Sequence, residues 1–427
     1  MLDIKLIREN IDLVKANIKK RGQTDKIVLA EKIKKDDEAW RKLKVQVDDL
    51  RAQRNKLSKQ IADDKKAGKD AKKLLKEAGE IPDKMDKIET ESQKLRDKID
   101  VELRELPNML HPSVPMGKDG SENPVVKEWG KIPKFDFELK NHSDLIEEAG
   151  LADFEAGRKN SGSGFNYLLS DMALLDHALQ RYGVDFLIRK GFTLVVPPML
   201  LNKETFLGAA NGVKDIAEVV YKVEDEDLFL IGTAEHSLVS LNKEKVLNVN
   251  DLPLKFCALT ACFRKEIGGH GVDMKGLFRM HQFNKVEQVV FVHPAKSFET
   301  LEEMQKITED FFQSLKIPYR VVEICSGDLS AKFAKQYDIE AWFPRQNTYR
   351  EVTSAGTCTD YQARALNIKF ADKGEKAFVH ILNNTMVATS RAMVAILENY
   401  QQKDGTVKIP DVLLPYMYGK KVIGRGN

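Results

Sequence analysis

The chain has 427 residues, which is long enough for two or three domains, and its hydrophobic content of 42% can fill a sizeable core. Charged residues make up 31% of the chain but leave a net charge of only +3, which excludes nucleic-acid binding through a uniformly basic surface. Four cysteines without a CxxC pair or metal-ligand spacing indicate reduced thiols, and no zinc is expected. No apolar run approaches the roughly 18 residues of a membrane span, so we expect a soluble, cytoplasmic protein without membrane contact.

The first 106 residues show helical periodicity and are predicted to form an N-terminal helical domain. Residues 2–20 predict a first helix that ends at Arg21 and Gly22. Two heptad runs follow, interrupted by the glycine-containing segment 63–70, and they predict an antiparallel two-helix coiled coil whose arms of roughly 35 residues project about 50 Å. The heptad positions are Trp40, Leu43, Val47, Leu50, Arg54, Leu57 and Ile61 on the first arm, and Ile81, Met85, Ile88, Ser92, Leu95 and Ile99 on the second.

Basic residues concentrate at the predicted tip of this arm. Three aspartates are outnumbered there by seven lysines: Lys59, Lys65, Lys66, Lys69, Lys72, Lys73 and Lys76. A basic end on a long arm suits contacts to a phosphate backbone that do not read bases. Dimerisation or spacing is the commoner use of a coiled coil, and a basic tip alone is usually a solvated turn.

Residues 107–427 are predicted to form a second, globular domain, entered through a Pro- and Gly-rich linker at about 107–134. Residues 171–190 predict an amphipathic helix that runs into the strand-like segment FTLVVPPML. Residues 228–231 predict a short strand, after which Thr233, Ala234 and Glu235 open a helix. A hydroxyl and a carboxylate at such a junction are often only helix caps.

The segment from residue 256 to residue 292 predicts two strands, 256–266 and 277–292, joined by a loop rich in glycine. Alternation places Arg264 and Glu266 on one face of the first strand. The matching face of the second carries Arg279, His281, Phe283, Lys285 and Glu287. Arginine fits phosphate oxygens and an aromatic ring can stack on a base. The spacing alone favours a nucleotide site and a salt-bridged outer sheet face about equally.

Two later segments complete the pattern of polar residues. Residues 338–354 predict a strand in which Glu351 and Ser354 can share a face only if a bulge lies near Thr353. Residues 378–382 predict a strand, Asn383, Asn384 and Thr385 a turn, and residues 391–400 a helix capped by Thr389 or Ser390. Arg391 then lies in the first turn of that helix, where an anionic ligand is the natural explanation for a cation.

The sequences FRKE and GLFRMHQFNKVE resemble motif 2 of class II aminoacyl-tRNA synthetases, in the form found in seryl-tRNA synthetases. The segment with FTLVVPPML resembles motif 1, which builds the homodimer interface in that class, and LNNTMVATSRAMVAILENYQ resembles motif 3. The arm and the Thr233-Ala234-Glu235 triplet also resemble the seryl family. The resemblance runs from residue 1 to about 418 and implies an α+β fold: an antiparallel class II catalytic sheet flanked by helices.

The family carries its functional residues at matching positions. The resemblance implies catalytic roles for Arg264 and Arg391, with adenine held between Phe283 and Arg391 and contacted by Glu266. It implies ATP contacts from Arg264, Lys265, Glu266, Met280, Phe283, Glu351, Val352, Thr353, Ser354 and Arg391. It implies Mg²⁺ binding with ATP at Glu351 and Ser354. It implies serine binding by Thr233, Ala234, Glu235, Arg264, Glu287 and Thr385.

The implied reaction joins L-serine to ATP and then to the 3′ end of serine tRNA, whose long variable arm the seven tip lysines would contact. The implied assembly is a homodimer, and selenocysteine tRNA is a further candidate substrate. The chain departs from the family at His236 and Ser237, which follow the triplet, and at Ala365, where a second arginine usually stands. Two rival hypotheses are a paralogue that loads another amino acid or a carrier protein, and a non-catalytic RNA-binding scaffold.

Overall fold

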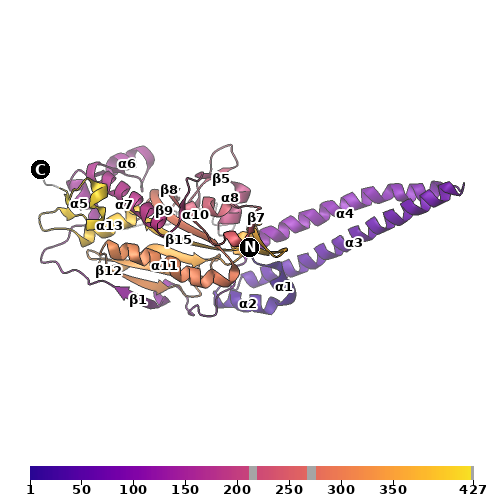
Figure 1. Cartoon of the computed structure of the whole chain (residues 1–427), viewed down its shortest axis with the longest axis horizontal. Helices are drawn as coiled ribbons and strands as arrows, with labels where there is room; N and C mark the ends of the chain where they lie inside the picture. The colour runs from indigo at the N-terminus through magenta and orange to yellow at the C-terminus, as the bar shows by residue number, and fades with distance from the viewer. Residues whose placement is uncertain (211–218, 267–275, 425–427) are drawn as a thin grey trace. The chain divides into compact units, whose positions relative to one another are not determined.

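The computed structural model describes residues 1–210, 219–266 and 276–424, and the chain divides into two compact units (Figure 1). The first unit comprises Met1–Lys19 and Gln23–Leu106, and the second comprises Lys20–Gly22 and Pro107–Asn427. The glycine-rich loop between the two predicted strands falls largely at residues 267–275, outside the described part. Every described helix is too short or too polar to cross a lipid bilayer.

The first unit is entirely helical in its described elements: α1 (Ile4–Glu9), α2 (Ile11–Lys20), α3 (Lys26–Lys66) and α4 (Lys72–Glu105). The prediction of one helix over residues 2–20 is wrong, because the helix breaks at Asn10. The backbone of Asn10 leaves the helical region at φ −150°, and its side chain accepts a hydrogen bond from the Leu13 backbone N–H. Asparagine commonly caps helices in this way, which explains why the apolar periodicity continues across two helices.

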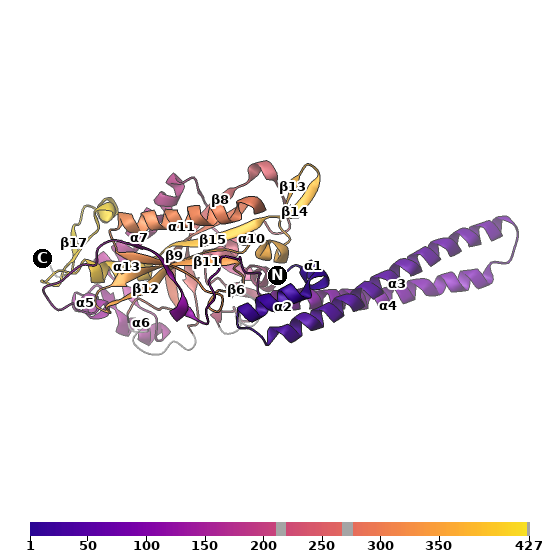
Figure 2. The same ribbon diagram turned by 90° about the horizontal axis from the view of Figure 1, so that it is seen from below.

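Helices α3 and α4 run side by side in opposite directions and confirm the predicted coiled coil (Figure 2). Val47, Leu57, Ile81 and Met85 form a buried cluster between them, as heptad positions should. The polar seam position Arg54 is exposed instead. A buried carboxylate, which the heptad pattern did not predict, lies nearer the start of α3: Asp37 accepts hydrogen bonds from Arg8 at 2.6 Å and from Arg41 at 3.1 Å.

An eight-stranded sheet organises the described part of the second unit, with strand order β1-β10-β11-β12-β15-β9-β8-β4. Neighbouring strands are antiparallel except β4 and β8, which confirms the predicted α+β architecture. The strands are β1 (Val125–Trp129), β4 (Thr193–Leu194), β8 (Leu254–Phe263), β9 (Gln282–Val292), β10 (Tyr319–Glu323), β11 (Lys335–Phe343), β12 (Thr348–Thr357) and β15 (His380–Ala388). Strand β1 lies inside the segment predicted to be a linker.

Helices α7 (Ser170–Arg189) and α11 (Ser297–Ser314) cover one face of this sheet. The site lies on the opposite face, part of which α10 (Ala234–Ser240) covers. Gln288 on β9 donates to Thr308 on α11 at 2.9 Å, and Val286 packs beside Gly183 of α7. Because side chains alternate along a strand, Lys285 and Glu287 point to the opposite face. The helices of this unit are α5 (His142–Glu148), α6 (Phe154–Ser161), α7 (Ser170–Arg189), α8 (Lys203–Ala209), α10 (Ala234–Ser240), α11 (Ser297–Ser314), α12 (Tyr361–Ala365) and α13 (Thr389–Asn399).

Shorter elements complete the unit. The small strands are β2 (Ala152–Asp153), β3 (Tyr167–Leu168), β5 (Leu200–Asn202), β6 (Leu228–Leu230), β7 (Val246–Asn248), β13 (Lys369–Asp372), β14 (Glu375–Phe378), β16 (Val407–Lys408) and β17 (Val422–Ile423). The 3₁₀ turns are η1 (Gly120–Glu122), η2 (Val249–Asp251), η4 (Pro294–Lys296) and η5 (Asp411–Met417).

Two local predictions about the sheet side of the site are corrected. The second strand begins at Gln282 rather than at residue 277, because Gly276 adopts φ +100° against His142 and the next residues bend. The predicted turn at Asn383, Asn384 and Thr385 lies inside β15. Polar residues in a row resemble a turn, but Asn384 is buried and donates to Met304 O at 3.0 Å and to Thr308 at 2.9 Å.

The predicted side-chain cap of the last helix is also wrong. Helix α13 starts at Thr389 with Ala388 as its N-cap residue and without a side-chain cap bond. Thr389 instead donates its hydroxyl hydrogen bond to Asn284 O at 3.2 Å. The prediction that Arg391 lies in the first turn is confirmed.

Candidate active site

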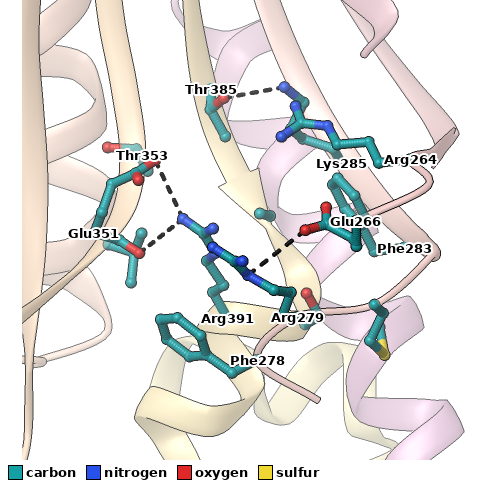
Figure 3. Close-up of a pocket in the computed structure, with 14 residues that line it drawn as sticks. Arg264, Glu266, Phe278, Arg279, Phe283, Lys285, Glu351, Thr353, Thr385 and Arg391 are labelled. Carbon is teal, nitrogen blue, oxygen red and sulfur yellow. Dashed lines mark hydrogen bonds and ion pairs between the residues drawn. The ribbon is translucent and has the colours of Figure 1, made fainter. Parts of the chain in front are cut away.

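Two adjoining pockets lie on the face of the sheet opposite α7 and α11. The first is lined by Arg264, Glu266, Phe278, Arg279, Met280, Phe283, Lys285, Glu351, Val352, Thr353, Thr385, Ala388, Ser390 and Arg391 (Figure 3). The second is lined by Phe206, Ala210, Val219, Val220, Gly232, Thr233, Glu235, His236, Phe263, Arg264, Lys285, Glu287, Ser330, Lys332, Phe333, Gln336, Glu351, Ser354, Asn383 and Thr385. They share Arg264, Lys285, Glu351 and Thr385, so ligands in the two pockets can meet at these four side chains.

Arginines and aromatic rings dominate the first pocket. The Arg264 guanidinium lies 5.4 Å from the centre of the Phe283 ring, and that of Arg391 lies 5.1 Å from the Phe278 ring. Arg279 and Glu266 form an ion pair at 3.5 Å across the pocket (Figure 3). Flat rings and planar cations together suit a ligand that combines an aromatic base with phosphates.

Arg391 is held in position from two sides. It projects from the first turn of α13, and its guanidinium contacts the carboxylate of Glu351 at 3.1 Å and the Glu351 carbonyl at 3.0 Å (Figure 3). A cation at the positive end of a helix is unfavourable by itself, so the carboxylate offsets part of the cost. The remaining N–H groups of Arg391 line the first pocket, where an anion can bind them.

A β-bulge sets the directions of the β12 side chains. Ile339 pairs with Thr353 and Glu340 with Glu351, so Val352 is the extra residue. The bulge near Thr353 that the sequence required is therefore confirmed. As a result Glu351 lines both pockets and Ser354 lines the second. The Ser354 hydroxyl accepts a hydrogen bond from Gln336 at 2.9 Å.

Two buried ion pairs organise the second pocket. On β9, Lys285 contacts Glu287 Oε2 at 2.5 Å, and the same oxygen accepts from Thr233 at 3.1 Å and from Thr385 at 3.4 Å. Opposite them, Lys332 donates to both oxygens of Glu235, at 2.6 Å and 2.7 Å. All four charged side chains are at most 8% exposed. Such pairs persist in a protein interior only with good geometry and further hydrogen bonds.

The charge of Glu235 is stabilised despite its burial. Burial opposes ionisation, but Lys332, with further contributions from His236 and Gln362, holds the pKa of Glu235 below its usual range. Gln362 adds a hydrogen bond to Glu235 Oε1 at 2.7 Å. Thr233 is the N-cap residue of α10, and its hydroxyl accepts from the Glu235 backbone N–H at 3.3 Å. The capping role and the placement of the Glu235 side chain in the second pocket therefore occur together.

His236 lines the second pocket as a neutral ring. Burial, more than the nearby charges, lowers its pKa to about 3, although the charge of Glu235 acts in the opposite direction. Its ring meets the edge of Phe206 with centroids 4.7 Å apart. Ser237, the next residue, points away and donates to Pro198 O at 2.6 Å.

The oxygen donors near the shared wall suit a magnesium ion that accompanies phosphates. Glu351 offers a half-exposed carboxylate, and Mg²⁺ typically needs only one or two carboxylates beside phosphate oxygens and water. Neighbouring Asp338 is partly buried, and burial followed by the charge of Glu351 raises its pKa to about 8. Among the residues described, no cluster of three or more His, Cys, Asp or Glu side chains forms a metal cage.

The structure brings most of the predicted site residues to the two pockets. Of the ATP set, Ser354 lines the second pocket and Lys265 lines neither, although its backbone N–H bonds to Val219 O. Of the serine set, Ala234 is buried in a hydrophobic cluster and only the other five line the second pocket. The seven tip lysines are exposed in the first unit.

Sequence reasoning missed Phe278, Lys332, Gln336 and Gln362. Phe278 lies within the stretch that resembles motif 2, and its aromatic ring could have identified it as a candidate for the pocket. Lys332 lies in the run SAKFAK with no pattern around it, and only the fold brings it to Glu235, almost a hundred residues away in sequence.

Comparison with known proteins gives consistent matches over the whole chain. The model of the seryl-tRNA synthetase N-terminal domain matches residues 1–110, and that of the tRNA synthetase class II core domain (G, H, P, S and T) matches residues 221–400. A serine–tRNA ligase from Methanocella arvoryzae is 47% identical over 422 residues, covering 98% of this chain and 99% of that protein. A serine–tRNA ligase from Pyrococcus horikoshii is 46% identical, and the match covers 99% of this chain and 98% of that protein.

Solved structures give the same picture. The crystal structure of seryl-tRNA synthetase from Pyrococcus horikoshii complexed with ATP matches with a TM-score of 0.93 and 46% identity, over 100% of both chains. The cytoplasmic serine–tRNA ligase of Naegleria fowleri, in complex with AMP, matches with a TM-score of 0.87 and 33% identity, over 100% and 99%. A prolyl-tRNA synthetase from Giardia lamblia, at 15% identity and a TM-score of 0.56 over 65% and 57%, shares the fold alone.

Proposed function

The chain belongs to the seryl-tRNA synthetase family, and we propose that its joined pockets bind ATP and L-serine, form seryl-adenylate and pass serine to tRNA. The observation that carries this proposal is the wall of four side chains common to both pockets, Arg264, Lys285, Glu351 and Thr385. It allows a nucleotide in the first pocket to present its α-phosphate to an amino acid in the second.

In the first step a carboxylate oxygen of serine attacks the α-phosphorus of ATP. The bond from that phosphorus to the bridging oxygen breaks, and pyrophosphate leaves with the electron pair. The reaction needs no protein nucleophile, so positioning and charge stabilisation supply the catalysis. Arg264 lies at the junction, where its Nε donates to Gly232 O at 3.1 Å and the rest of its guanidinium can hold the α-phosphate and the serine carboxylate.

The remaining first-pocket residues receive the rest of the nucleotide. Phe283 and Arg391 are assigned to the two faces of adenine, and Glu266 to its exocyclic amine. Arg391 also holds the γ-phosphate, since it already lies in the first turn of α13 beside Glu351. A Mg²⁺ ion held by Glu351 and the hydroxyl of Ser354 would neutralise phosphate charge.

The second pocket is assigned to serine, with Thr233, Glu235, Glu287 and Thr385 as its polar contacts. A pocket that hydrogen-bonds a hydroxyl rejects alanine strongly, because alanine leaves its buried polar groups unpaired. Threonine would be rejected by size.

The second step transfers serine to the 3′-hydroxyl of the terminal adenosine of serine tRNA. We assign the exposed lysines at the tip of α3 and α4 to the phosphate backbone of the long variable arm, because a group of exposed cations on a long arm suits a polyanion. The enzyme is assigned to the cytoplasm, where tRNA is charged.

A homodimer is part of the proposal. Apolar side chains lie exposed on and near β4, in the segment that resembles motif 1: Ile188, Leu194, Val196, Met199 and Leu200. Val196 is 92% exposed, and an apolar run of this kind is normally covered by a partner.

Amino-acid-dependent exchange of pyrophosphate into ATP tests the proposed function. We expect the purified protein to exchange much faster with serine than with threonine, alanine, glycine or cysteine. Preference for another amino acid would retain the fold and contradict the assigned substrate. Exchange with none of them would favour a non-catalytic RNA-binding scaffold.

A further inference from the structure

The two carboxylates of the second pocket are not equivalent. Lys332 contacts both oxygens of Glu235, whereas the partners of Glu287 converge on Oε2 alone. Among residues 1–210, 219–266 and 276–424, no side chain or backbone group donates to Glu287 Oε1. A new donor can therefore reach Glu287 more easily than Glu235.

The two lysines differ as well. Lys285 lines both pockets and can turn toward the phosphates of a nucleotide, which would release Glu287. Lys332 lines only the second pocket, and Glu235 is the partner of both its hydrogen bonds within the described residues. Lys332 therefore stays with Glu235 when a nucleotide binds.

A substrate ammonium is poorly matched to the Lys332–Glu235 pair. If it donated to either oxygen of Glu235, it would lie roughly 4–5 Å from the ammonium of Lys332, since each N–O hydrogen bond spans about 2.8 Å. Like charges at that separation in a buried site repel strongly. A neutral hydroxyl meets no such repulsion, because it can accept a hydrogen bond from Lys332 and donate one to Glu235.

We propose that the Lys332–Glu235 pair recognises the side-chain hydroxyl of the amino-acid substrate, while Glu287 binds its ammonium group. Lys332 is then a specificity-determining residue that contacts the substrate. An ammonium has three N–H donors, and the two bonds to Glu235 leave one for the ligand. This inference rests on the proposed function, because it takes the second pocket as the amino-acid site.

The test compares serine with alanine in pyrophosphate exchange and, separately, in calorimetric binding. Lys332→Met should lower kcat/KM for serine about 100-fold and that for alanine by less than about threefold, because only serine loses a partner. Glu235→Gln should act in the same direction. Glu287→Gln should lower kcat/KM for serine and for alanine by the same factor, since both amino acids carry the ammonium group.

The matched control is Lys335→Met. Lys335 is also a largely buried lysine with a carboxylate partner, Glu323 at 3.3 Å, but it lines neither pocket. Lys335→Met should leave the ratio of kcat/KM for serine to kcat/KM for alanine unchanged. The double variant Lys332→Met with Glu235→Gln removes both charges of the pair, so neither partner is left as an unpaired buried charge that could unfold the protein. Its ratio should also fall.

Three results would overturn the inference: an equal loss for serine and alanine in Lys332→Met, an equal loss in Glu235→Gln, or a wild-type ratio in the double variant. Failure of the proposed function looks different, because it is seen in the unaltered protein as missing serine-dependent exchange. In that case the role of Lys332 is still tested by calorimetry, which compares the affinities for serine and alanine in the wild type and in Lys332→Met.

Discussion

Lysines at the tip of the coiled-coil arm and lysines in the second pocket are placed in opposite ways. All seven tip lysines are exposed, whereas Lys285 and Lys332 are at most 8% exposed and each contacts a carboxylate at 2.5–2.7 Å. Exposed charges near water act on a polyanion through their number and are screened by salt. Buried charges act through their position, and removing one leaves its partner unpaired. The number of lysines therefore matters at the tip, whereas the position of each lysine matters in the second pocket.

The largest effect should come from a single change in the first pocket. Arg391→Ala removes the cation that faces Glu351 and the assigned γ-phosphate, so serine-dependent exchange should fall by about 10³-fold. Binding of serine tRNA, measured by filter retention, should change by less than about twofold. Unaltered exchange would remove Arg391 from the nucleotide site and weaken the contrast between the two regions.

At the tip, only the collective change should matter. Replacing all seven lysines with glutamine, which keeps helix propensity, should lower kcat/KM for tRNA charging by about 10²-fold and flatten its dependence on salt. Serine-dependent exchange should stay within about twofold. The control replaces seven exposed lysines of the second unit with glutamine: Lys131, Lys134, Lys159, Lys203, Lys373, Lys376 and Lys421. Equal losses in both variants would argue against a specific role of the tip.

Asp37 is a buried charged residue within the coiled-coil unit. It is fully buried against Arg8 and Arg41, so it should behave like a pocket residue although it belongs to the coiled-coil unit. Asp37→Ala should lower the free energy of unfolding of this unit by about 1–3 kcal/mol. Urea unfolding followed by circular dichroism at 222 nm checks it. Asp48→Ala, on the exposed surface of the same helix, should cost less than about 0.5 kcal/mol.

The smallest effect should come from one tip lysine. Lys69→Gln alone should change tRNA charging by no more than about twofold, since six neighbours share its task. Charging rates at low and moderate salt measure this. A tenfold loss would mean that Lys69 acts through position, as the pocket lysines do.

Sequence patterns predicted the features that repeat or that lie close together in the chain. The heptads of α3 and α4, the Thr233 cap beside Glu235, the bulge next to Thr353 and the place of Arg391 in its helix were all accessible in this way. Local propensity misled at Asn383, Asn384 and Thr385, because buried polar residues in a central strand resemble a turn. Their partners lie on distant segments: α11 for Asn384, Cys358 for Asn383 and Glu287 for Thr385.

Contacts between distant segments could not be predicted from one sequence. Glu235 and Lys332 meet only because α10 and the segment before β11 both reach the second pocket. Neither the ion pair nor its meaning for substrate choice follows from the residues that surround each partner in the chain. The assigned roles of the pocket residues rest on this tertiary arrangement and stay predictions until they are measured.

The most direct test of the whole account separates the two chemical steps in one experiment. Wild type and the seven-lysine variant are incubated with serine and radiolabelled ATP, the stoichiometry of the pyrophosphate burst is measured, and serine tRNA is then added. We expect an equal burst of about one pyrophosphate per active site in both proteins, followed by rapid transfer of serine only in the wild type. A reduced burst in the variant, or transfer at the wild-type rate, would contradict the division of work between the pockets and the arm.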